Sequence, residues 1–238
     1  MEEELQELFP GIRVLRMDTD TVAPAGSHER LFDQFRKENI PIMVGTQMVT
    51  KGLNFENVTL VGVICADQSL YAGDYRAGER TFSLITQVIG RSGRGSKPGR
   101  AVIQTYTPGN ETILQAAQQD YEAFYRSELE LRRLQAAPPF RDILTITATG
   151  PTEANVVHAC RTAKQRLSCL LGDREDCTIL GPTPLAVVRV NDRYRYRVII
   201  NCRADNMVRK AVSRTIIECN TNKNLKDVML FADNDPMD

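Results

Sequence analysis

Two arginines three positions apart stand in the segment Gln87-Val88-Ile89-Gly90-Arg91-Ser92-Gly93-Arg94. Each guanidinium carries fixed donors that match phosphate oxygens in pairs, and glycines let a backbone approach its ligand closely. Because the segment follows a helical pattern, both arginines can point from one helix end to a single place. Such a pair is typical of arginines that stabilise a triphosphate during its hydrolysis. The alternative is a basic helix end favoured by the helix dipole, which explains one arginine but not the whole segment.

A second segment, Gly45 to Phe55, directly follows the short apolar run Ile40 to Val44. Its hydroxyl, amide and backbone donors would lie at the carboxyl end of a strand, where open α/β sheets bind ligands. Lys51-Gly52 looks like part of a phosphate-binding loop, but that loop needs the order Gly-x4-Gly-Lys-Ser/Thr. No other stretch of the sequence fits this order. We therefore expect that this chain alone does not hydrolyse ATP.

Strand and helix patterns alternate through the first half of the sequence. Apolar runs at 11–17, 40–44, 57–66 and 100–106 indicate strands, while 28–39 and 80–89 have helical spacing. Because the runs are apolar on both faces, we expect a parallel sheet covered by helices, which is an α/β fold. A charged amphipathic helix is predicted over 111–134, ended by Pro138-Pro139. This proline pair predicts two domains, 1–137 and 138–238.

The second half has a different order of elements. We predict strands at 143–149, 185–190, 194–202 and 227–232, with helices at 153–171 and 205–219. Asn191-Asp192-Arg193 would join the middle two strands as a hairpin. The resulting order β-α-β-β-α-β is typical of an α+β ferredoxin-like domain.

Composition is that of an ordinary folded protein, with 42% hydrophobic and 25% charged residues. The 30 basic and 30 acidic side chains cancel, so any nucleic-acid binding must come from local patches. No apolar run is long enough to span a membrane, and the acidic start does not resemble a secretion signal, so we expect an intracellular protein. The six cysteines form no close pairs and only two histidines are present, which argues against a metal site.

An alternation of arginine and tyrosine marks one predicted strand of the second half. Arg193, Arg195 and Arg197 would face one way and meet successive phosphates, while Tyr194 and Tyr196 would face the other way and offer stacking surfaces. The alternative is a hairpin with a polar solvent face and an apolar core face. Arg209, Lys210 and Arg214 form a second basic patch on the following helix. Arg209 and Lys210 are weak candidates for a partner contact, and a solvated helix face is the favoured interpretation.

The two segments described first resemble motifs V and VI of superfamily 2 helicases. Other motifs narrow the resemblance to the replication-restart helicases of that superfamily: Gly45-Thr46-Gln47-Met48, Ala66-Asp67, and Asp74-Tyr75-Arg76 with Glu79-Arg80. Leu8-Phe9-Pro10-Gly11, Gln104-Thr105, Pro138-Pro139-Phe140, Leu180-Gly181-Pro182 and Asp233-Asn234-Asp235-Pro236 extend it over nearly the whole chain. The sequence departs from the family at Arg193-Tyr194-Arg195-Tyr196, where tryptophans interleaved with arginine are expected.

The resemblance implies part of an ATP-dependent 3′→5′ DNA helicase that restarts stalled replication forks and loads the primosome. This chain would hold the second RecA-like lobe and the C-terminal domain. The first lobe, a DNA-binding domain and a zinc-binding insertion would precede it. ATP and Mg²⁺ would bind between the two lobes. The expected partners are DNA, single-strand-binding protein and primosome proteins, in the bacterial cytoplasm at the nucleoid.

The resemblance also implies roles for individual residues. Arg91 and Arg94 would be catalytic, and the nucleotide would contact Gln87, Gly52 and Gly90. DNA would contact Thr46, Gln47, Lys51, Arg193, Arg195 and Arg197, and a protein partner would contact Arg209 and Lys210. A different class of function stays open, a non-catalytic RecA-like docking module whose second domain binds RNA or protein. The set Gln87, Arg91 and Arg94 argues against it, because docking alone has no chemical need for these residues.

Overall fold

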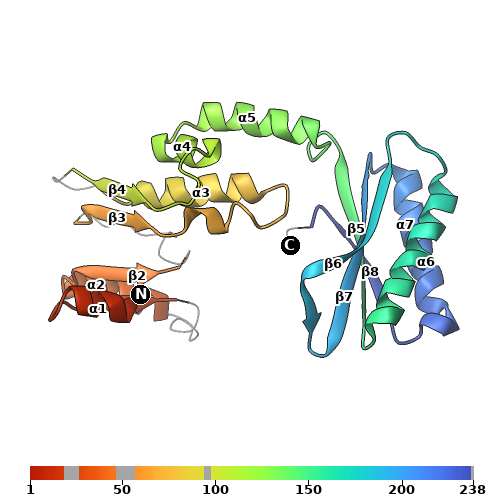
Figure 1. Ribbon diagram of the computed structural model, residues 1–238, viewed down its shortest axis with the longest axis horizontal. Helices are drawn as coiled ribbons and strands as arrows, with labels where there is room; N and C mark the ends of the chain where they lie inside the picture. Colours follow the sequence, from red (N-terminus) through yellow and green to blue (C-terminus); the bar gives the residue numbers. More distant parts are fainter. Residues whose placement is uncertain (19–26, 47–56, 94–97, 237–238) are drawn as a thin grey trace. The chain divides into compact units, whose positions relative to one another are not determined.

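The computed structural model describes residues 1–18, 27–46, 57–93 and 98–236, and Figure 1 maps their helices and strands. The chain divides into two compact units. One consists of Met1–Gly73 with Ala77–Phe124, and the other of Asp74–Arg76 with Tyr125–Asp238. Asp74–Arg76 therefore groups with the C-terminal unit, although it lies in the first half of the sequence. Within the described ranges, no helix has the length and apolar character needed to cross a membrane.

The first unit combines helices with two pairs of parallel strands. Strand β1 (Val14–Met17) pairs with β2 (Ile42–Gly45), and β3 (Leu60–Val63) pairs with β4 (Arg100–Ile103). The helices are α1 (Glu2–Leu8), α2 (Ser27–Lys37), the short 3-10 helix η2 (Ala66–Gln68), α3 (Ala77–Ile89) and α4 (Glu111–Gln118). Parallel pairing within a mixture of helices and strands agrees with the expected α/β class.

Among the described residues, helices cover one side of the strands β3 and β4. Val63 and Ile103 pack against a cluster that includes Phe82 and Ile85 of α3. On the other side, the described residues leave Leu60 61% exposed and Val102 50% exposed. The expectation of burial on both faces is therefore wrong for this pair, because the helices that pack on it all contribute to the same cluster.

The predicted single helix over 111–134 is two helices, α4 and α5 (Tyr121–Leu134). Gln119 adopts the left-handed conformation, with φ of 55°, and its N–H donates to the carbonyl of Ala116. Asp120 then accepts a hydrogen bond from Ala123 N at 3.0 Å, as an N-cap residue does. Apolar spacing continues across this turn, so the periodicity alone could not place the break.

The C-terminal unit has the predicted order of elements. These are β5 (Asp142–Gly150), α6 (Glu153–Leu171), β6 (Thr178–Val190), β7 (Arg193–Cys202), α7 (Asn206–Thr221), the 3-10 helix η3 (Lys223–Leu225) and β8 (Met229–Asn234). The four strands form one antiparallel sheet in the order β6-β7-β5-β8. Strand β6 begins earlier than the predicted residue 185, because Gly181 and Pro182 lie at an irregularity within the strand and not at a turn before it.

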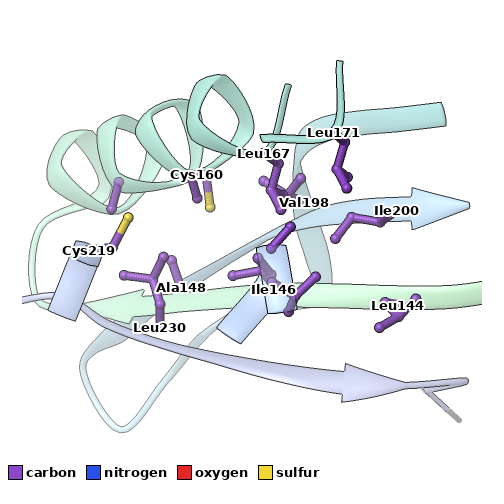
Figure 2. Packing of buried hydrophobic residues seen from close by; sticks show 14 of the residues in the cluster. Leu144, Ile146, Ala148, Cys160, Leu167, Leu171, Val198, Ile200, Cys219 and Leu230 are labelled. Carbon is purple, nitrogen blue, oxygen red and sulfur yellow. The ribbon is translucent and has the colours of Figure 1, made fainter. Parts of the chain in front are cut away.

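The core of the C-terminal unit lies between one face of this sheet and the helices α6 and α7, which lie on the same side of it (Figure 1). Figure 2 shows Ile146, Ile200 and Leu230 of the sheet among the buried side chains, together with Cys160 and Leu167 of α6. Burial raises the pKa of the Cys160 thiol to about 12, so this thiol stays protonated and unreactive at neutral pH. The opposite face of the sheet receives no helix from this unit.

A buried carboxylate joins the chain after β3 to the chain after β4. Asp67 accepts hydrogen bonds from the hydroxyls of Thr105 and Thr107 and from the backbone N–H of Tyr106. The Thr107 hydroxyl contributes most to lowering the pKa of Asp67 to about 2, burial opposes this shift, and Thr105 and Tyr106 add to it. Because these partners are about 40 residues away in sequence, the pattern Ala66-Asp67 did not indicate their contact.

Asp67→Asn should lower the free energy of unfolding at pH 7, because one carboxylate oxygen becomes an NH2 group that faces donors. The folded pKa of Asp67 lies below its unfolded value of about 3.9, so its contribution is present above pH 4 and is lost as the pH falls towards 2. Urea unfolding from pH 7 down to pH 3 measures this, with the exposed Asp173→Asn as control. A stability difference between wild type and Asp67→Asn that does not shrink in acid would contradict the assignment.

Candidate functional site

The arginine segment begins at the end of α3. Gln87 is in the last turn of this helix, and its side-chain amide donates to the Ser83 hydroxyl at 2.9 Å. The backbone N–H of Arg91 donates to the carbonyl of Val88 at 3.0 Å, so Arg91 lies one turn beyond Gln87. The Nε atom of Arg91 is buried. Because Nε belongs to the guanidinium, part of this group is withdrawn from solvent.

A contact between two glycine backbones holds the next part of the segment. Gly93 has a φ of 72°, and a Cβ atom added there would lie 2.6 Å from the backbone nitrogen of Gly99. Gly93 N also donates to the carbonyl of Val58 at 3.1 Å, just before β3. Arg94 lies between these two glycines but outside the described residues. The sequence analysis did not identify Gly99 as part of the site. The one feature that could have indicated it is its position directly before a predicted strand.

Of the second predicted segment, only its start is described. Thr46 follows β2 at its carboxyl end, as predicted, and its N–H donates to the carbonyl of Met17 at 3.4 Å. The Thr46 side chain is exposed. Gln47, Lys51 and Gly52 lie outside the described residues, so their predicted roles stay predictions.

Tyr75 lies between two guanidinium groups. The Arg76 and Arg132 guanidinium carbons are 5.0 and 5.2 Å from the centre of its ring. Arg132 also forms an ion pair with Glu128 at 2.8 Å, with both side chains less than 15% exposed, and donates to the carbonyl of Pro138. These contacts explain why Asp74–Arg76 groups with the C-terminal unit. Sequence reasoning missed Arg132 because its helix pattern resembles any charged helix face.

The predicted arginine row lies on the sheet face opposite α6 and α7. Val198 and Ile200 of β7 are buried beneath these helices, so Arg193, Arg195 and Arg197 alternate to the other face. Arg193 is held in place because its guanidinium donates to the Thr149 carbonyl at 2.8 Å. The predicted facing of the arginines is thus confirmed, while their binding role stays a prediction.

The two tyrosines of β7 pack on the helix side of the sheet. Tyr194 and Tyr196 contact the buried cluster there, and the Tyr196 hydroxyl donates to Glu153 at the start of α6. The expectation that they offer stacking surfaces to a ligand is therefore wrong. Each ring instead covers the edge of the core, because the strand alternation that places the half-buried arginines on the other face turns the tyrosines towards the helices.

The second basic patch borders a pocket on α7. Arg209 and Lys210 are both exposed, and the Arg209 Nε donates to the carbonyl of Ala204 at 3.3 Å. Lys210 lines a pocket of about 410 Å³ together with Leu170, Met207, Asn206, Ala211 and Arg214. Apolar and basic side chains therefore meet here, which a solvated helix face alone would not require. Among the described residues, no cluster of histidine, cysteine and acidic side chains could hold a metal ion.

Gly93→Ala should lower the free energy of unfolding by roughly 2 kcal/mol or more, because a Cβ atom there requires an unfavourable φ and overlaps the Gly99 backbone. Gly109→Ala is the matched control, since a Cβ atom at Gly109 meets nothing within 4 Å. Urea unfolding of both variants measures the difference. Equal stability of the two variants would show that the glycine contact does not hold the arginine segment.

Two family models match the chain. The helicase conserved C-terminal domain matches residues 1–96, and the primosomal protein N C-terminal domain matches residues 133–237. The replication restart protein PriA of Bacillus subtilis is 39% identical over 236 residues, covering 99% of this chain and 29% of that protein. PriA of Synechocystis is 38% identical over 198 residues, covering 83% of this chain and 24% of that protein. PriA of Chlamydia pneumoniae is 37% identical over 244 residues, covering all of this chain and 31% of that protein.

This chain thus spans less than a third of the length of these relatives. The first family match ends at residue 96 and the second begins at residue 133. The chain belongs to the PriA family of replication restart proteins and carries the C-terminal helicase region and the C-terminal domain of that family.

Proposed function

We propose that this chain is the second motor lobe and the C-terminal domain of an ATP-dependent 3′→5′ DNA helicase that restarts stalled forks and loads the primosome. The observation that carries the proposal is the arginine segment at the end of α3, inside the region that matches the helicase C-terminal domain. The contact of Gly93 with the Gly99 backbone, two residues beyond Arg91, supports a fixed backbone at this end of the helix. We further propose that the protein acts in the bacterial cytoplasm, at the nucleoid.

In this proposal, Arg91 and Arg94 stabilise negative charge that grows on the terminal phosphate of ATP. Gln87, Gly90 and Gly52 contact the same nucleotide. The other lobe binds ATP together with Mg²⁺, and the ATP supplies the reacting phosphoryl group. Arg91 suits this role because part of its guanidinium is withdrawn from water, where attraction to phosphate charge is stronger than in solvent. This chain alone would be inactive, since it has no phosphate-binding loop. Thr46, Gln47 and Lys51 would contact the DNA backbone.

We propose that residues 138–238 form a ferredoxin-like domain that binds DNA through Arg193, Arg195 and Arg197. The order of the elements and the strand order β6-β7-β5-β8 support this fold. The three arginines lie on the sheet face opposite α6 and α7, which supports contact with an extended, negatively charged ligand. The boundary near residue 137 is also a proposal, and the family match that starts at residue 133 supports it.

A second proposal concerns the pocket beside Lys210. Its apolar residues Leu170 and Met207 and its basic residues Lys210 and Arg214 suit a peptide that is both acidic and hydrophobic. The tail of single-strand-binding protein has this character, so we propose that it docks here, next to Arg209.

Lys210→Glu should abolish binding of a synthetic acidic tail peptide, and unchanged binding would exclude this pocket.

In the full-length protein, Arg91→Ala and Arg94→Ala should each reduce DNA-stimulated ATP turnover by about 10³- to 10⁵-fold, because such an arginine acts on charge that develops in the transition state. Lysine at either position should restore little activity, since an ammonium lacks the paired donors of a guanidinium. Steady-state ATPase rates, DNA affinity and thermal melting should be measured together. Wild-type turnover in both alanine variants would support the non-catalytic docking module, and a large loss of melting temperature would make the arginines structural.

The chain should bind single-stranded DNA with an affinity that falls steeply as salt rises, because binding releases counterions from phosphates. Arg195→Gln should weaken binding at low salt and reduce the slope of log affinity against log salt by about 0.7. Fluorescence anisotropy measures both, with Arg203→Gln, an exposed arginine just beyond β7, as the matched control. An equal effect of the two substitutions would remove the special role of the arginine row.

A further inference from the structure

Two cross-strand rows combine an apolar side chain with an arginine on the open face of the C-terminal sheet. The central strand β5 pairs with β8 on one side and with β7 on the other. Thr149 lies opposite both Met229 and Arg195, and Thr147 lies opposite both Phe231 and Arg197. Each row therefore runs from an apolar residue on β8, over a threonine, to an arginine on β7.

The apolar members of these rows are exposed, although they are large. Met229 is 60% exposed and Phe231 is 44% exposed, whereas Leu230 between them is 1% exposed and faces the helices. Thr147 is buried, so the short threonine lies below its taller neighbours. Strand β8 is an edge of the sheet, where exposed apolar side chains favour aggregation unless a ligand covers them. The exposed apolar side chains of β8 form one side of this face, here called its apolar edge. The arginines of the inner strand β7 form the other side, here called its basic edge.

The dimensions of the face suit one strand of nucleic acid. Neighbouring strands lie about 4.8 Å apart, so the apolar edge and the basic edge are separated by roughly 10 Å. Rows two residues apart along a strand are separated by roughly 7 Å, a spacing on the scale of one nucleotide in an extended chain. Arginines on one edge can meet phosphates while an aromatic ring on the other stacks on a base. Duplex DNA hides the faces of its bases, so only unpaired DNA can use both edges.

The charge around the face gives it a positive end. Beside Met229, a pocket of about 320 Å³ is lined by Arg193 and Lys226, together with Pro151, Asp227 and Val228. Beyond the Phe231 row, the next position on β8 that faces this way is the exposed Asp233, opposite Thr145. Positive side chains thus lie in the Met229 and Phe231 rows and in the pocket, and the negative side chain of Asp233 lies beyond the Phe231 row. This arrangement is complementary to a short phosphate chain.

We propose that Phe231 is a base-stacking residue for single-stranded DNA, assisted by Met229, and that Arg195 and Arg197 hold the phosphates of the stacked nucleotides. The proposal rests on the DNA-binding role proposed above for the arginine row. It adds that the face selects unpaired bases, and it transfers the stacking role from the tyrosines of β7 to the edge strand β8.

The test measures binding of the 238-residue chain to a fluorescent oligothymidylate, to the same backbone without bases, and to duplex DNA. Phe231→Ala should weaken binding to oligothymidylate by about 5- to 100-fold, which is the range for losing one stacked base. The same substitution should leave binding to the abasic strand and the salt slope unchanged. Phe231→Tyr should restore the affinity, because it keeps an aromatic face. Ile217→Ala is the matched control, since Ile217 is 61% exposed on α7, on the opposite side of the domain.

The outcomes separate this proposal from the one on which it rests. If Arg195→Gln weakens binding while Phe231→Ala does not, the arginines bind DNA and the stacking proposal is wrong. If neither substitution matters, the DNA-binding role of the whole face fails. Equal losses of Phe231→Ala on the oligothymidylate and the abasic strand would also overturn stacking. Self-association of the chain that Phe231→Ala abolishes, without DNA binding, would assign the face to a second copy and exclude the proposal.

Discussion

The double pairing of the central strand β5 determines which side of the C-terminal sheet each side chain takes. Because β7 and β8 both pair with β5 in fixed register, Ile146, Val198 and Leu230 all turn towards α6 and α7. A slip of one residue would place arginines in the core and leave valine and isoleucine in water, so the buried face strongly specifies the register. The arginines and Phe231 come together on the other face as a direct consequence of that register. The proposed DNA surface is thus a by-product of how the core is formed.

A different constraint acts in the helicase lobe, where backbone contacts and not side-chain packing position the chemistry. Gly93 and Gly99 approach each other too closely for any side chain, and the Gly93 N–H donates to the carbonyl of Val58, two residues before β3. The backbone that follows Arg91 at the end of α3 is therefore held in place by these contacts. Asp67 joins the chain beyond the opposite ends of β3 and β4 with a carboxylate that stays ionised above about pH 4. The same two strands are thus tied at both ends, which suits a lobe that must present an arginine without distortion.

Local patterns predicted much of the fold, and contacts between distant residues account for the rest. Helix α6 begins and ends where it was predicted, at 153 and 171, and the hairpin at Asn191-Asp192 matches its turn residues, both of which have positive φ. The break at Gln119 escaped prediction, because the apolar spacing continues through it. The bonds of Asp67, the contact of Tyr75 with Arg132 and the placement of Phe231 and Arg197 on either side of Thr147 all bring together residues far apart in sequence. The spacing of arginines and glycines indicated a phosphate site directly. The proposed base-stacking residues of β8 could be recognised only once the strand order was known.

We assign a nucleotide to the end of α3 and single-stranded DNA to the open face of the C-terminal sheet, in addition to the DNA contacts proposed for Thr46, Gln47 and Lys51. Hydrogen exchange of the full-length protein, measured with a non-hydrolysable ATP analogue and separately with single-stranded DNA, tests this assignment most directly. We expect the nucleotide to slow hydrogen exchange of the backbone amides around 87–93. We expect DNA to slow hydrogen exchange of the amides in 193–197 and 229–231. Protection of 193–197 and 229–231 by the nucleotide, or no change there with DNA, would contradict the assignment.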